Sequence, residues 1–112
     1  MNWEQLRKNI KGRVVTRQDA AFEKVKAEMV WNAIKPDRSP DVIVTVLDDD
    51  DVVTAVNFAR ENGLKVVVHG GGHTWCGLAV RNGGMTIDLT NLNESNIDKA
   101  TRTAIIQPVI SN

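Results

Sequence analysis

Two short apolar segments separated by a helical pattern constrain the fold of this chain more than any other feature. Residues 42–47 (VIVTVL) and 65–69 (KVVVH) are continuous and rich in β-branched residues, as expected of strands that are buried on both faces of a sheet. Residues 48–62 have the apolar spacing of a helix, so the three segments together predict a right-handed parallel crossover. Residues 85–89 (MTIDL) predict a third strand. We therefore expect an α/β (α+β) fold in which helices flank a small central parallel sheet.

Two helices are expected to pack on this sheet, over residues 18–34 and 48–62. Each has apolar residues at three-to-four spacing, which predicts one buried face per helix. The residues of these faces are Phe22, Val25, Met29 and Val30 in the first helix, and Val52, Val56 and Ala59 in the second.

Short polar residues predict where these helices begin and end. Thr16 and Asp19 are candidate N-caps of the first helix, and Asp48 or Asp49 is the candidate for the second. The remaining acidic residues of this run are expected in the first helical turn, where the helix dipole favours anions, rather than in a metal or phosphate site. Gly63 suits the left-handed position that follows a helix.

The rest of the chain predicts smaller elements within one domain. Residues 2–10 are typical of a short helix, and residues 14–15 of a short extended piece. Residues 97–99 and 103–107 are typical of two short strands around a turn. Because a chain of 112 residues is sufficient for one domain and too short for two ordinary ones, we expect a single domain over residues 1–112.

Composition excludes several classes of protein. Lys plus Arg and Asp plus Glu each number 14, so the chain has no bulk electrostatic attraction to nucleic acid or to an anionic membrane. No apolar run approaches the ~20 residues that span a bilayer. Cys76 is the only cysteine, which excludes an intrachain disulfide. We therefore expect a cytoplasmic protein with no nucleic-acid or membrane partner.

The most informative segment for function is the glycine-rich run that follows the second strand, residues 69–77 (HGGGHTWCG). Glycines let backbone N–H groups converge on one point and let a ligand approach closely. The carboxyl end of parallel strands is also where open α/β sheets bind ligands. An anion such as a pyrophosphate suits this loop, and for the glycine triplet alone a flexible turn without chemistry is an equal alternative. The spacing is neither that of a Rossmann fingerprint nor that of a P-loop.

A metal site or a cysteine nucleophile in this run is the weaker interpretation. His69, His73 and Cys76 have the spacing H-x3-H-x2-C, but the pattern occurs once and the sequence has no second ligand group, whereas zinc sites usually have four N or S ligands, or three and a water. Cys76 also fits a small buried apolar residue. Cysteine–histidine catalysis lacks an orienting third group. We therefore expect no metal ligands and no catalytic residues in this chain.

The order of motifs around the glycine run supports a specific family. Residues 66–89 (VVVHGGGHTWCGLAVRNGGMTIDL) resemble the flavin-binding segment of the berberine-bridge-enzyme-like FAD-linked oxidases, part of the vanillyl-alcohol-oxidase (PCMH-type) superfamily. The resemblance extends over residues 12 to 108. The other segments that match in order and spacing are Trp31–Asn32, Pro40, Asp51–Val52, Leu92–Asn93 and residues 104–108.

This resemblance implies the first subdomain of a PCMH-type FAD-binding domain, with FAD as the cofactor. In that family the glycine loop surrounds the FAD pyrophosphate with backbone N–H groups, and the loop histidine is often bonded to the 8α-methyl of the flavin. His73 matches that histidine, whereas His69 stands where the family usually has arginine, and Val109 where a glycine usually follows the proline. The cofactor-binding residues that the resemblance implies are His69, Gly70, Gly71, Gly72, His73, Thr74, Gly77 and Leu78.

The resemblance also sets expectations about partners. Members of the family are several times longer, with a substrate domain and a catalytic base, so we expect a truncated FAD-binding portion of an oxidoreductase that is inactive alone, with the remainder of an oxidase as a partner. The alternatives are a non-catalytic interaction module and a binder of a small anion or nucleotide. Unpaired backbone groups at residues 103–107 (TAIIQ) predict a homo-oligomer, most simply a dimer, with the C-terminal strands or the glycine-loop face at the contact.

Overall fold

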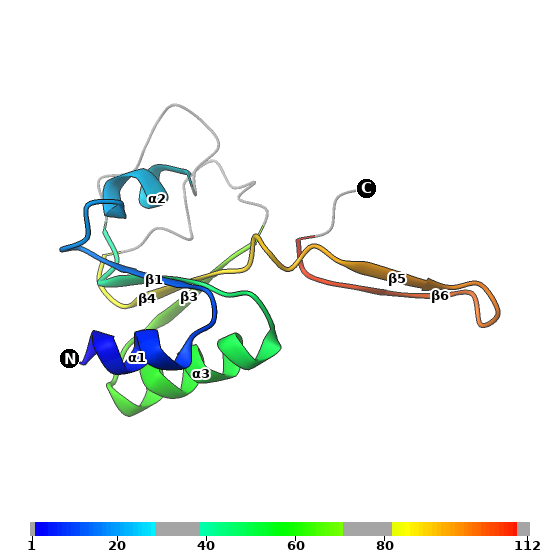
Figure 1. Cartoon of the computed structure of the whole chain (residues 1–112), viewed down its shortest axis with the longest axis horizontal. Helices are drawn as coiled ribbons and strands as arrows, with labels where there is room; N and C mark the ends of the chain where they lie inside the picture. Colours follow the sequence, from blue (N-terminus) through cyan, green and yellow to red (C-terminus); the bar gives the residue numbers. More distant parts are fainter. Residues whose placement is uncertain (1, 29–38, 71–81, 110–112) are drawn as a thin grey trace.

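The structure is a computed structural model that describes residues 2–28, 39–70 and 82–109. It contains a four-stranded sheet, three helices and a separate two-stranded hairpin (Figure 1). The helices are α1 (Trp3–Asn9), α2 (Phe22–Glu28) and α3 (Asp49–Glu61). The strands are β1 (Arg13–Thr16), β2 (Val42–Thr45), β3 (Val66–His69), β4 (Met85–Asp88), β5 (Ser95–Asp98) and β6 (Thr103–Ile106).

The sheet has the order β1-β2-β4-β3. Both β2 and β3 pair with β4 in parallel, which confirms the crossover and the three predicted parallel strands. The predicted extended piece at residues 14–15 becomes β1, which pairs antiparallel with β2. The sheet is therefore mixed, with a parallel centre and one antiparallel edge strand.

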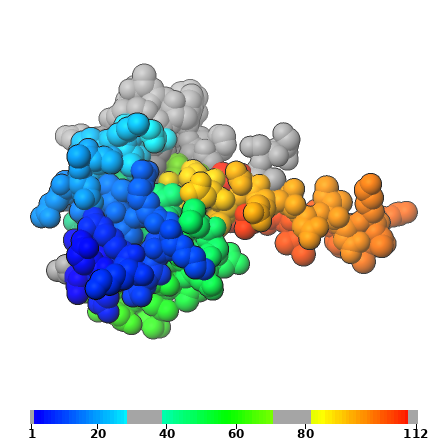
Figure 2. Space-filling model, in the orientation of Figure 1, coloured from blue at the N-terminus to red at the C-terminus, as the bar shows by residue number. Residues whose placement is uncertain are grey.

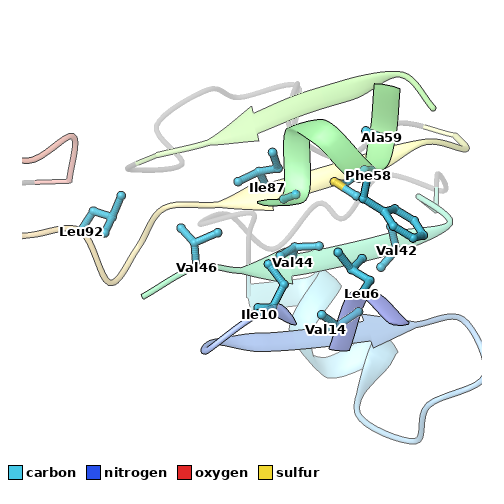
Figure 3. Close-up of a cluster of buried hydrophobic side chains, with 12 residues drawn as sticks. Leu6, Ile10, Val14, Val42, Val44, Val46, Phe58, Ala59, Ile87 and Leu92 are labelled. Atoms are coloured by element: carbon cyan, nitrogen blue, oxygen red, sulfur yellow. The ribbon is translucent and has the colours of Figure 1, made fainter. Parts of the chain in front are cut away.

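One apolar layer lies between the sheet and the helices α1 and α3, which cover the same face (Figures 1 and 3). Val44 on β2, Ile87 on β4 and Leu6 of α1 are fully buried in it, and Phe58 of α3 is buried beside them. The rings of Trp3 and Phe58 lie with centroids 5.8 Å apart, which joins the two helices. On the opposite face of the sheet, α2 contributes Phe22 and Val25 to a smaller cluster with Val15 and Ile43.

The expected boundaries of the first long helix are wrong at its start. α2 begins at Phe22 rather than at residue 18, because residues 16–19 form a turn. Thr16 belongs to β1 and is no N-cap, and the carboxylate of Asp19 accepts hydrogen bonds from the backbone N–H and hydroxyl of Thr16. The expected continuation to residue 34, with Met29 and Val30, lies outside the described residues.

α3 matches its predicted ends and part of its predicted buried face, since Ala59 is buried and Val52 packs partly buried against the core, but Val56 does not. Asp48 is the N-cap and accepts the backbone N–H of Asp51 at 3.0 Å, and Gly63 takes a positive φ of 67° just after the helix. The buried residues are Asp51, Ala55, Phe58 and Ala59, whereas the predicted Val56 is 43% exposed. The helix has this orientation because the backbone N–H groups of Lys11, Gly12 and Leu47 donate hydrogen bonds to the carboxylate of Asp51.

The predicted C-terminal strands form a hairpin, in which β5 and β6 pair antiparallel with each other. This hairpin extends away from the rest of the molecule, and all eight of its strand residues are exposed (Figures 1 and 2). Within the described ranges, no helix is long and apolar enough to cross a membrane.

Candidate functional site

Four polar residues lie side by side at the carboxyl end of the parallel strands. The register pairs Arg13 with Thr45, Thr45 with Asp88, and Asp88 with His69. Residues that are paired across neighbouring strands point to the same face of a sheet. Arg13, Thr45, Asp88 and His69 therefore form one continuous row across all four strands, which we call the end-of-strand row.

The end-of-strand row lies on the face opposite α1 and α3. Side chains alternate between faces along a strand, and the neighbouring residues Val14, Val44 and Ile87 belong to the apolar layer under α1 and α3. The row thus shares its face with α2. Three of its members are almost fully buried, with exposures of 9% for Thr45, 7% for Asp88 and 5% for His69.

Asp88 is the most constrained side chain of the row. One carboxylate oxygen accepts the backbone N–H of Thr90 at 3.1 Å, and the other accepts the hydroxyl of Thr45 at 3.5 Å. The backbone carbonyl of His69 accepts the N–H of Leu89 at 2.9 Å, which extends the pairing of β3 and β4 past the strand ends. These contacts fix the point from which the glycine-rich run leaves the sheet.

The environment of His69 favours the neutral form of its imidazole. Burial lowers its pKa below the ordinary value of 6.5, and the nearby charge of Asp88 opposes that shift without reversing it. His69 therefore acts as a polar group without a charge, able to donate one hydrogen bond and to accept another.

A cavity of about 250 Å³ opens over the row. Its wall contains the four row residues together with Glu28 of α2 and, beyond β4, Thr90 and Asn91. Polar groups that converge on a cavity at the carboxyl end of parallel strands are typical of a binding site for a small polar ligand.

Gly70, the first glycine of the run, directly follows His69, the last residue of β3. Its φ is not in the left-handed region, and a methyl group built on it would meet no described atom within 4 Å. Gly84 differs, because its φ of 76° and the carbonyl oxygen of Lys65 exclude a side chain there. Neither backbone conformation nor packing within the described part requires glycine at position 70, which is consistent with close approach of a ligand.

Of the cofactor-binding residues expected from the sequence, the structure describes two. His69 and Gly70 lie at the row and next to it. The other expected residues, Gly71, Gly72, His73, Thr74, Gly77 and Leu78, lie outside the described residues, as does Cys76. Among residues 2–28, 39–70 and 82–109, no cluster of three or more His, Cys, Asp or Glu side chains could hold a metal ion.

Sequence reasoning missed Arg13 and Thr45 as members of the site. Each lies at the end of an apolar strand segment, where a polar residue signals only that the strand is ending. Only the strand order brings them to the site. β1 pairs with β2, and β4 lies between β2 and β3 in space although it follows both along the chain.

Comparison with known proteins places this geometry in context. The family model described as "FAD binding domain" matches residues 40–111. Among curated proteins, the (R)-6-hydroxynicotine oxidase of Paenarthrobacter nicotinovorans is 34% identical over 92 residues, which cover 82% of this chain and 19% of that protein. The FAD-linked oxidoreductase pgmH of Aspergillus terreus is 34% identical over 106 residues, which cover 93% of this chain and 22% of that protein.

Solved structures have the same fold. The crystal structure of 6-hydroxy-D-nicotine oxidase from Arthrobacter nicotinovorans superposes with a TM-score of 0.78 at 34% identity, covering 91% of this chain and 22% of that one. The berberine-bridge-enzyme-like protein 1 of Physcomitrella patens superposes with a TM-score of 0.79 at 22% identity, covering 95% of this chain and 23% of that one. The chain spans about a fifth of the length of the relatives that it matches.

Proposed function

This chain belongs to the FAD binding domain family, with a match over residues 40–111, and from that premise we propose that it holds FAD at the carboxyl end of its parallel strands, as the flavin-binding part of an FAD-linked oxidoreductase. The observation that carries the location is the polar cavity at the carboxyl end of the parallel strands, whose wall includes His69, the residue directly before the glycine run. FAD is the cofactor named in the description of the family and in the names of the FAD-linked relatives.

The residues present fit FAD. A pyrophosphate needs converging N–H donors and little side-chain bulk, and the run that starts at Gly70 has three consecutive glycines. We propose that the cofactor is held by His69, Gly70, Gly71, Gly72, His73, Thr74, Gly77 and Leu78. His73 is the candidate for a covalent bond to the flavin. When bound, FAD supplies the redox chemistry by accepting electrons from the substrate.

We propose that substrate binding and proton transfer depend on protein outside these 112 residues, the remainder of the oxidoreductase. The chain spans about a fifth of its curated relatives, and the row contains no charged histidine or paired nucleophile and base. Within this proposal the domain's own task is to bind and orient the flavin. A cytoplasmic location is supported by the single cysteine.

The test is a titration of the purified chain with FAD, monitored by the quenching of flavin fluorescence. The absorbance of the protein after acid precipitation then measures covalently bound flavin. Saturable quenching is expected, and a flavin band that survives precipitation in the wild type but not in His73→Ala supports the covalent bond. A chain that binds neither FAD nor ADP at millimolar concentration refutes cofactor binding and favours an interaction module. Binding of ADP without FAD favours the small-nucleotide alternative.

We also propose that the chain self-associates through its hairpin. The register places Ile97, Ala104 and Ile106 on one face of β5–β6, and the two isoleucines are 70% and 59% exposed. An isolated two-stranded hairpin is at best marginally stable in water, and a second copy that covers this face forms a closed two-fold dimer. The zero net charge of the chain offers no repulsion against it.

A further inference from the structure

Apolar side chains are exposed on α3 and β3 as well as on the hairpin. Among the described residues outside the hairpin, four of the five exposed large apolar side chains belong to these two elements: Val53 and Val56 of α3, and Val66 and Val68 of β3. Val68 pairs with Ile87, which belongs to the apolar layer under α3, so the strand valines lie on the α3 face of the sheet. We call these four residues the valine patch.

The valine patch lies at one edge of the sheet. β3 is an edge strand, and among the described strands it pairs with β4 alone. The opposite edge belongs to α1, because Arg7 donates a hydrogen bond to the carbonyl of Val14 on β1. α3 shares a groove with α1 on the side that holds Thr54 and Asn57. Val56 lies about 200° around the helix from Thr54, at 3.6 residues per turn, so it points away from α1 and toward β3.

The valine patch and the hairpin are both flanked by charges without partners. Asp49 lies in the first turn of α3 and Arg60 in its last turn. Glu94 directly precedes β5, and Lys99 directly follows it. In the described part of the chain, none of these four side chains forms an ion pair. The acidic end of each surface can therefore face the basic end of the other.

The two surfaces also match in length. From Asp49 to Arg60 the helix rises about 16 Å, at 1.5 Å per residue. From Glu94 to Lys99 the strand rises about 16 Å, at about 3.3 Å per residue. If Lys99 lies beside Asp49 and Glu94 beside Arg60, Ile97 lies level with the valines of α3. One orientation of the hairpin therefore pairs both charges and places apolar groups on apolar groups.

We propose that the hairpin of one copy of the chain lies on the valine patch of a second copy, with Ile97, Ala104 and Ile106 against the valines. This inference rests on the proposed self-association and names the surface that receives the hairpin. The fourth strand residue of this hairpin face is Ser95, so the face carries no charge. An apolar edge strand such as β3 is a site at which another chain adds.

The direction of the hairpin makes the exchange reciprocal. The hairpin extends away from its own α3, so its own valine patch is left open for the hairpin of the neighbour (Figure 1). A two-fold dimer of this kind uses the same contact twice. Two contacts bury twice the area of one, which favours a stable dimer because contacts of less than about 800 Å² are typical of weak encounters.

The experiment is sedimentation velocity of the whole chain at micromolar concentration, with circular dichroism to check that each variant is folded. Val56→Lys is expected to convert the dimer into a monomer, as is Ile97→Lys, because each buries an unpaired charge at the contact. Leu47→Lys is the matched control. Leu47 is exposed but lies outside both the valine patch and the hairpin, so this variant is expected to remain a dimer.

An exchange of charges tests the orientation. Arg60→Glu and Glu94→Arg are each expected to raise the dissociation constant of the dimer about tenfold, because like charges then meet twice in each dimer. The chain with both substitutions is expected to recover the wild-type value. A double variant that is as weak as the two single variants overturns the orientation.

The outcomes separate this contact from the self-association on which it rests. If Val56→Lys remains a dimer while Ile97→Lys is a monomer, the valine patch does not receive the hairpin, and two hairpins that pack on each other explain the dimer. A wild-type chain that sediments as a monomer overturns both.

Discussion

At the scale of single residues, Asp51 ties three segments of the molecule together. Its side chain is 1% exposed, and its carboxylate accepts the backbone N–H groups of Lys11 and Gly12 at 2.9 Å and of Leu47 at 3.0 Å. The connection before β1, the end of β2 and the first turn of α3 therefore meet at one carboxylate. This acidic residue has a structural task, although it lies in a run of four aspartates that resembles a surface patch.

Asp51→Asn is expected to lower the free energy of unfolding by at least about 2 kcal/mol. The amide has only one acceptor oxygen, so at least one buried N–H loses its partner and the charge assistance is lost. Urea unfolding followed by circular dichroism measures the change. The control is Asp50→Asn, whose side chain is 88% exposed and where a change within about 0.5 kcal/mol is expected. Equal effects of the two substitutions would contradict this role for Asp51.

His69 predicts a dependence of stability on pH. Its pKa is lowered by burial in the folded chain, so at pH values just below the ordinary 6.5 the unfolded chain binds a proton that the folded chain does not. The contribution of His69 is therefore lost as the pH falls from 6.5 toward the lowered value. His69→Gln is expected to reduce the difference between unfolding free energies at pH 7.5 and pH 5.5. A variant with the same or a larger pH difference than the wild type would exclude this assignment.

At the scale of elements, the sheet and the hairpin differ in how they are stabilised. Every residue of β2 and β4 is buried between helices, whereas every residue of β5 and β6 is exposed. The sheet is held by apolar packing on both faces. The hairpin is held by its own ladder and by the turn in which Asp98 accepts the N–H groups of Ala100 and Thr101.

Substitution of isoleucine by alanine distinguishes these two elements. Ile87→Ala on β4, at a position 1% exposed, is expected to lower the free energy of unfolding by about 2–5 kcal/mol, because it leaves a cavity in the main core. Ile105→Ala on β6, at a position 75% exposed, is expected to change it by less than about 0.5 kcal/mol. Denaturant unfolding measures both, and a larger effect at residue 105 would show that the hairpin is buried in solution.

At the scale of the whole molecule, the hairpin is the part to which we assign the proposed contact between copies. It extends from the body (Figure 2), and the pairing of β5 with β6 makes one of its faces more apolar than the other. Ile97, Ala104 and Ile106 share that face, while Ile105 shares the opposite face with Asn96.

This difference between faces makes the proposed dimer testable. Ile97→Lys is expected to convert the dimer into a monomer in sedimentation velocity at micromolar concentration, because it would bury an unpaired charge at the contact. Ile105→Lys, an identical change on the other face, is expected to leave the dimer intact. A wild-type chain that sediments as a monomer, or two variants that behave alike, would refute this contact.

The sequence alone determined the parallel strands, the crossover helix with its cap at Asp48 and turn at Gly63, and the family. These features depend on local signals: β-branched runs, polar caps, and glycines in fixed order. The resemblance at residues 66–89 supplied the cofactor, because the order of several motifs is far more specific than one glycine triplet.

Only the tertiary structure decided which face of α3 is buried and which residues surround the cavity. Three backbone N–H groups from other segments donate to Asp51, and α3 buries Ala55 and Phe58 beside the predicted Ala59, while the predicted Val56 is exposed. The end-of-strand row exists only because β4 lies between β2 and β3, which brings together residues up to 75 positions apart. Strand order is set by packing across the whole sheet, so no local pattern in the sequence contains it.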